Sequence, residues 1–134
     1  MMQKAVQEKM IVHHMDFDTA YLNADLDCDV YVKQPEGFVE KTNMVWKLKK
    51  SLYGLKQSGR CWNTHLNKFL TSECFVRSMT DPCLYTYFDG KNTVNIISWV
   101  DDLLIAASNQ EILDKIKSVL FSTAYFSNVI YHLL

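Results

Sequence analysis

The chain has 134 residues, of which 49% are hydrophobic and 13% aromatic, and it carries a formal net charge of −1. This apolar content excludes an intrinsically disordered chain, and the near-zero charge excludes a general electrostatic attraction for nucleic acid. The first ten residues carry charges where a signal peptide would have its apolar segment, and no apolar run reaches the roughly 18 residues of a membrane helix. We therefore expect one intracellular domain, or part of one, with no membrane partner.

The N-terminal part of the sequence predicts mainly extended segments. KMIVHHMDF, residues 9–17, predicts a strand that ends at Asp16 or shortly after it. A short turn or helix is expected in DTAYLNADL, where Asp18 or Thr19 can cap its start. VYVKQPEGF, residues 30–38, is expected to be extended and to end at a Pro-x-Gly turn.

The C-terminal part predicts a helix, three strands and a second helix. GRCWNTHLNKFLTS has apolar residues at helical spacing, which is typical of an amphipathic helix. CLYTYF and TVNIISWV predict strands joined by a turn at Asp89 and Gly90, and LLIAA predicts a further strand. In SNQEILDKIKSVL, Ser108 and Glu111 form a predicted capping box at the start of a helix. This order predicts an α+β fold in which helices cover one face of a mainly antiparallel sheet.

Two adjacent aspartates, Asp101 and Asp102, interrupt the otherwise apolar run IISWVDDLLIA. A carboxylate taken out of water without a partner is costly, and two neighbouring carboxylates also repel each other. The pair is compatible with a solvent-facing hairpin turn or with a divalent cation held at a strand end. If the strand ending at Asp16 lies beside this hairpin, three carboxylates converge on a site that suits two Mg²⁺ ions roughly 4 Å apart.

Charge is segregated along the sequence. Residues 16–29 hold five aspartates and no Lys or Arg, whereas residues 41–60 hold six basic residues and no Asp or Glu. A basic segment beside an acidic site suits a polyanion held near metal-binding carboxylates. Two ordinary solvated faces of opposite charge explain the same pattern, so both interpretations stay open.

Four blocks resemble, in this order and at these spacings, the reverse transcriptase of copia-type LTR retrotransposons: MDFDTAYLNADLDCDVYVKQPEGF, VWKLKKSLYGLKQSGRCWN, DPCLYTYFDG and WVDDLLIAAS. The similarity covers about residues 11–121. It implies that residues 1–121 form a partial palm domain of a right-hand polymerase, with a ferredoxin-like sheet, and that residues 122–134 are a divergent C-terminal tail. The implied reaction is templated transfer of a deoxynucleotide from dNTP to a primer 3′-hydroxyl.

The resemblance also implies roles for individual residues. Asp16, Asp101 and Asp102 match the catalytic, metal-binding aspartates, which would hold two Mg²⁺ ions, or Mn²⁺ as a substitute, with Asp102 nearer the primer end. One ion would lower the pKa of the primer hydroxyl, and the other would hold the triphosphate and stabilise the leaving pyrophosphate. Trp99 stands on the primer side, where the family usually has Tyr. Tyr21 matches the aromatic residue that excludes a ribose 2′-hydroxyl, although simple core packing also explains a tyrosine there.

A second group of matched residues lies in YGLKQSGR. Gln57 matches the family's nucleotide-side glutamine, and Lys56 and Arg60 would then face the template or the incoming phosphates. Ser58 and Gly59 depart from the Ala-Pro expected of the family, which loosens a turn that proline would fix.

Two classes of function follow from the resemblance. The chain is either the polymerase core of a retrotransposon polyprotein or a catalytically inactive, truncated relic with at most weak metal or nucleic-acid binding. In the first case its partners are an RNA or DNA template-primer, dNTP, and the remaining fingers, thumb and ribonuclease H parts, which we expect to be missing from this chain. The family implies work in cytoplasmic retroelement particles before the DNA reaches the nucleus.

Overall fold

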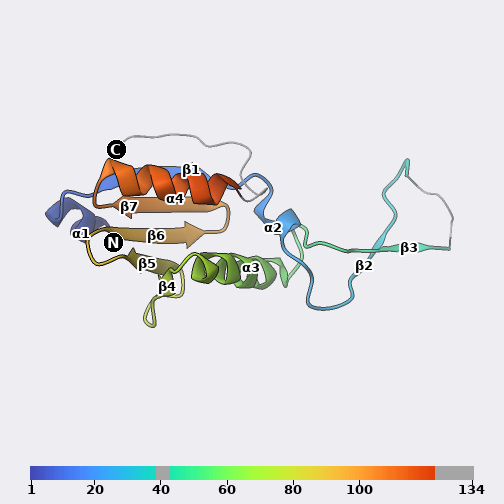
Figure 1. Ribbon diagram of the computed structural model, residues 1–134. Helices are drawn as coiled ribbons and strands as arrows, with labels where there is room; N and C mark the ends of the chain where they lie inside the picture. Colours follow the sequence, from blue (N-terminus) through green and yellow to red (C-terminus); the bar gives the residue numbers. More distant parts are fainter. Residues whose placement is uncertain (39–42, 123–134) are drawn as a thin grey trace.

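An antiparallel five-stranded sheet organises residues 1–38 and 43–122, the part of the chain that the computed structural model describes (Figure 1). Its strand order is β1-β7-β6-β5-β4, and every neighbouring pair is antiparallel. The strands are β1 (Ile11–Asp16), β4 (Val76–Arg77), β5 (Leu84–Phe88), β6 (Thr93–Trp99) and β7 (Asp102–Ala107). Because β1 joins the sheet beside β7, the first strand of the sheet lies next to the last one.

Two long helices cover one face of this sheet. α3 packs on β4, and α4 packs on β7 (Figure 1). The helices of the described residues are α1 (Met2–Gln7), α2 (Ala20–Asn23), α3 (Ser58–Ser72) and α4 (Gln110–Ser122). In this part of the chain, no helix combines the length and the apolar content needed to cross a bilayer.

The core lies between the sheet and the two long helices. Alternate residues of the strands are buried on this face, and they pack against one apolar stripe of each helix. The fully buried members include Met15, Ile96, Leu103 and Ile105 from the sheet, Leu70 from α3 and Leu113 from α4. Since strand side chains alternate between faces, residues such as Asp16 and Asp102 belong to the opposite face of the sheet.

A second, two-stranded sheet lies apart from the five-stranded one (Figure 1). Its antiparallel strands are β2 (Tyr31–Lys33) and β3 (Val45–Lys47). The expected Pro-x-Gly turn is confirmed after β2, where the Phe38 N–H donates to the Pro35 carbonyl and Gly37 has a positive φ of 84°.

The predicted order of elements is confirmed, with α1, β3 and β4 as additions. The α+β class and the mainly antiparallel sheet are also confirmed. The tail predicted for residues 122–134 lies outside the described residues, apart from Ser122 at the end of α4.

The predicted cap at Ser108 is wrong, and of the two residues expected to cap α2, Thr19 does not. At the start of α4 the Oδ1 of Asn109 accepts the N–H of Ile112 at 3.1 Å, whereas the Ser108 hydroxyl accepts the N–H of Thr93. The Ser108 hydroxyl therefore links the segment after β7 to the start of β6, and Asn109 caps α4 instead. Thr19 precedes α2 in a left-handed conformation and forms no side-chain cap.

Candidate active site

Antiparallel pairing of β1 with β7 sets the position of the three aspartates. Asp16, the last residue of β1, lies directly opposite Asp102, the first residue of β7. Asp101 belongs to the two-residue loop that joins β6 to β7, because Trp99 pairs with Asp102. The strand adjacency on which the predicted convergence of these carboxylates depends is therefore present.

A histidine lies beside Asp102 on the uncovered face of the sheet. His14 precedes Asp16 by two residues, so strand alternation puts both on the same face. The Nε2 atom of His14 lies 2.6 Å from Oδ1 of Asp102, and both side chains are partly exposed. This contact ties the first residue of β7 to β1 through side chains as well as through the backbone.

The two carboxylate oxygens of Asp101 have different surroundings. Oδ2 accepts a hydrogen bond of 2.7 Å from the Tyr53 hydroxyl. Burial and the hydrogen bond to Asp101 raise the pKa of Tyr53 to about 12, so its phenol is a neutral donor at neutral pH. Oδ1 is buried and has no hydrogen-bond partner among the described residues. Buried carboxylate oxygens are normally bound to a hydrogen-bond donor or a cation, and the structure supplies neither to Oδ1 of Asp101 among the described residues.

Electrostatic repulsion acts among the three aspartates. The pKa of Asp16 is raised first by burial, then by the nearby carboxylates of Asp102 and Asp101, and His14 opposes this rise. A divalent cation would relieve the repulsion, and carboxylate oxygens are ligands that Mg²⁺ prefers. The chemistry of the donor set and the orphaned oxygen of Asp101 therefore fit such an ion.

The described residues do not form a complete set of metal ligands around one point. Within residues 1–38 and 43–122, no group of three or more His, Cys, Asp or Glu side chains is gathered closely enough to hold a metal ion. Oδ1 of Asp102 instead contacts His14, and Oδ2 of Asp101 accepts from Tyr53. The carboxylates are near enough to repel one another, but ion binding requires their side chains to turn toward a common point.

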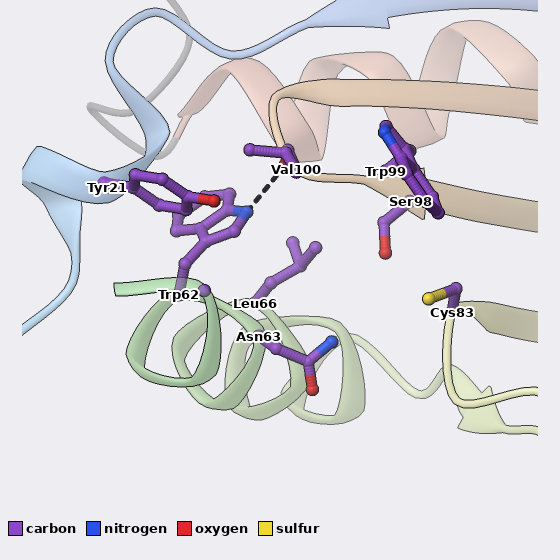
Figure 2. A pocket seen from close by; sticks show the side chains of 9 residues that line it. Tyr21, Trp62, Asn63, Leu66, Cys83, Ser98, Trp99 and Val100 are labelled. Carbon is purple, nitrogen blue, oxygen red and sulfur yellow. Dashed lines mark hydrogen bonds between the residues drawn. The ribbon is translucent and has the colours of Figure 1, made fainter. Parts of the chain in front are cut away.

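An apolar cavity of about 200 Å³ lies beside these aspartates, between α3 and the end of β6. Tyr21, Trp62 and Val100 are among its lining residues (Figure 2). The Tyr21 ring also packs against the Tyr53 ring, with 4.5 Å between centroids. Trp99 borders the cavity and is 74% exposed, so most of its ring is available to a bound molecule.

Lys56, Gln57 and Arg60, predicted to face phosphate, lie at or just before the start of α3. Gln57 and Arg60 contact the acidic segment, residues 16–29. The Gln57 amide contacts the Sγ of Cys28 at 3.7 Å, and the Arg60 guanidinium pairs with Asp27 at 2.7 Å. Lys56 is exposed in the loop before α3. In the part of the chain that the structure describes, there is no contact between these three side chains and Asp16, Asp101 or Asp102, whereas Tyr53 is hydrogen-bonded to Asp101.

Mutual pairing accounts for part of the charge segregation. Three exposed ion pairs of 2.7 Å join the acidic segment to basic residues: Asp25–Lys50, Asp27–Arg60 and Asp29–Lys47. Hydrogen bonds from the lysines lower the pKa values of Asp25 and Asp29. Exposed pairs of this kind are weak because water and salt screen them.

Sequence reasoning missed His14 and Tyr53 as members of the site. His14 could have been found, because a strand places residues two apart on the same face. Tyr53 carried no comparable signal, since it reaches Asp101 from a loop 48 residues away in the sequence.

Comparisons with known proteins agree with the resemblance. The sequence matches the family model described as reverse transcriptase (RNA-dependent DNA polymerase) over residues 1–132. It is 39% identical over 109 residues to the Retrovirus-related Pol polyprotein from transposon TNT 1-94 of Nicotiana tabacum, a match that covers 79% of the chain and 8% of the polyprotein.

Two further relatives extend this result. The Putative transposon Ty5-1 protein YCL074W of Saccharomyces cerevisiae is 43% identical over 108 residues, which are 79% of the chain and 35% of the yeast protein. The Retrovirus-related Pol polyprotein from transposon RE1 of Arabidopsis thaliana is 39% identical over 111 residues, which are 81% of the chain and 8% of the polyprotein. The chain thus spans far less than two thirds of these relatives' lengths. No solved structure shows significant similarity to it.

The raised pKa of Asp16 predicts a gain in stability when its charge is removed. A pKa raised above 3.8 in the folded state stabilises the fold below that pH, and this contribution is lost as the pH rises through the folded-state pKa. We expect Asp16→Asn to raise the melting temperature at pH 7 without divalent cations and to change little below pH 3.8. Thermal unfolding between pH 3 and pH 8 measures this, with the exposed Glu36→Gln as control. A lower melting temperature at pH 7 would contradict the repulsion.

Proposed function

The chain belongs to the reverse transcriptase family of copia-type retrotransposon Pol polyproteins, and from this membership we propose that it is the palm portion of an RNA-directed DNA polymerase. The proposed reaction transfers a deoxynucleotide from dNTP to the 3′-hydroxyl of a primer on an RNA or DNA template. The observation that carries the proposal is the register of β1 with β7, which sets Asp16 opposite Asp102, the residue that follows Asp101 in the chain.

In this proposal Asp16, Asp101 and Asp102 would hold two Mg²⁺ ions, with Asp102 nearer the primer end. The ions, when bound, supply a lowered pKa for the primer hydroxyl and charge stabilisation for the leaving pyrophosphate. The protein itself supplies orientation: Tyr53 and His14 hold the carboxylates of Asp101 and Asp102 through hydrogen bonds. The His14 contact engages Oδ1 of Asp102, and the other carboxylate oxygen would then bind the ion.

The nucleotide and primer meet different parts of the proposed site. Tyr21 fills the space that a ribose 2′-hydroxyl would need, a role supported by its ring contact with Tyr53, which is bonded to Asp101. Trp99 presents its exposed ring to the primer end. Gln57, Lys56 and Arg60 are proposed to meet template or triphosphate, and Arg60 would exchange its exposed pairing with Asp27 for a phosphate.

The proposed partners are a template-primer duplex, dNTP and the other domains of a Pol polyprotein, and the proposed location is cytoplasmic retroelement particles with later access to the nucleus. A catalytically inactive relic is the second candidate. It is favoured by one observation, that in the described part of the chain the aspartates are not gathered into a closed metal-ligand group.

Primer extension separates the two candidates. We expect the 134-residue chain to add dTMP to an oligo-dT primer on poly-rA in the presence of Mg²⁺ or Mn²⁺, and Asp101→Asn to reduce this to background. Both proteins are first compared by circular dichroism to establish that they fold alike. Absence of incorporation by the folded wild-type chain, or equal incorporation by the variant, would reject polymerase activity of this palm portion on its own.

Replacement of Tyr21 tests the sugar-excluding role. We expect Tyr21→Ala to raise the ratio of ribonucleotide to deoxynucleotide incorporation by about tenfold or more, because a small side chain leaves room for the 2′-hydroxyl. Tyr21→Phe retains the ring and should behave like the wild type. Tyr31→Ala, which removes an exposed tyrosine on β2, serves as control. An unchanged ratio in Tyr21→Ala would mean that this tyrosine only packs.

A further inference from the structure

The loop that carries Asp101 is strained. It consists of Val100 and Asp101 between the paired residues Trp99 and Asp102. Val100 has a φ of 53°, in the left-handed region, at the loop position that glycine normally occupies in a type II′ hairpin turn. For a β-branched residue this conformation is a genuine outlier, and it persists only where the surrounding structure holds it.

Both backbone carbonyls of this loop are held from outside the hairpin. The indole N–H of Trp62, on α3, donates a hydrogen bond of 2.7 Å to the Val100 carbonyl (Figure 2). The backbone N–H of Phe17, just after β1, donates one of 2.7 Å to the Asp101 carbonyl. The two donors support each other, because the Phe17 and Trp62 rings pack edge to face with 4.7 Å between centroids and Trp62 is only 3% exposed.

The Trp62 hydrogen bond acts on the peptide that precedes Asp101. The Val100 carbonyl lies in the planar unit that joins Val100 to Asp101, so its direction sets φ of Asp101 and hence the direction of that side chain. The carboxylate at the end of this side chain has one oxygen bonded to Tyr53 and the other buried without a partner in the described part of the chain. A change in φ of Asp101 that is not compensated at Val100 would displace both oxygens.

We propose that Trp62 is a positioning residue: its indole N–H holds Val100 in the left-handed conformation and thereby aims the Asp101 carboxylate at the metal site. The inference rests on the proposed function in one respect, that Asp101 binds a divalent cation. It gives Trp62 a role that its place in the apolar stripe of α3 does not require, since packing alone would need only the ring.

The test uses variants that remove the indole N–H while keeping an aromatic ring, or that remove the backbone strain at Val100 while keeping the hydrogen bond. Trp62→Phe retains an aromatic ring without the donor, and Val100→Gly removes the strain because glycine adopts the left-handed region freely. The double variant combines them. Trp46→Phe, on β3 and outside the site, is the matched control for loss of an indole, and Asp101→Asn defines the binding that depends on the site.

Two measurements are made on the full chain. The first is the dissociation constant of Mn²⁺, from the free-ion signal in electron paramagnetic resonance. The second is the set of ¹H–¹⁵N chemical shifts of the Val100 and Asp101 amides without metal. We expect Trp62→Phe to weaken the Asp101-dependent Mn²⁺ binding by about tenfold and to shift both amide signals. Adding Val100→Gly should restore the affinity to within about threefold of the Val100→Gly single variant, and Trp46→Phe should change neither readout.

Either of two results would overturn the proposal. Wild-type Mn²⁺ affinity and unshifted amides in a folded Trp62→Phe variant would mean that the N–H does not position the loop. A loss that Val100→Gly fails to restore would mean that Trp62 acts through packing alone. If the proposed metal site does not exist, Asp101→Asn will leave Mn²⁺ binding unchanged. The amide shifts of Trp62→Phe will still show whether Trp62 holds the turn.

Discussion

The antiparallel pairing of β1 with β7 is the constraint on which the site depends. The register sets Asp16 opposite Asp102, and the two-residue loop before β7 leaves Asp101 little freedom to lie elsewhere. This arrangement is unfavourable for the protein alone, because burial and the neighbouring carboxylates together raise the pKa of Asp16. A divalent cation bound among these carboxylates would relieve this repulsion.

The rest of the structure maintains this arrangement. α3 and α4 pack on one face of the sheet and supply the core, so the opposite face can carry Asp16, His14 and Asp102. α3 also contributes Trp62, which connects the core directly to the loop that contains Asp101. Stability and function are therefore linked through the same helix, and strain at Val100 is tolerated where it orients a functional group.

The sequence predicts much of the fold because its strands and helices carry strong local patterns. β1, β5, β6, β7, α3 and α4 follow from periodicity and turn residues, and the four matched blocks indicate the aspartates. The Ser108 cap failed because the hydroxyl bonds to Thr93, which is close in space and distant in sequence. Tyr53, the Trp62 hydrogen bond and the pairing of Arg60 with Asp27 depend in the same way on contacts between segments that no local pattern reveals.

We propose that a divalent cation relieves the repulsion among these aspartates. This proposal is tested most directly by the melting temperatures of the wild type, Asp16→Asn and Asp101→Asn over a range of Mg²⁺ concentrations at constant ionic strength. Binding to the folded state predicts that Mg²⁺ raises the melting temperature of the wild type progressively and leaves both variants nearly unchanged. An equal rise in all three proteins, or none in the wild type, would contradict the account.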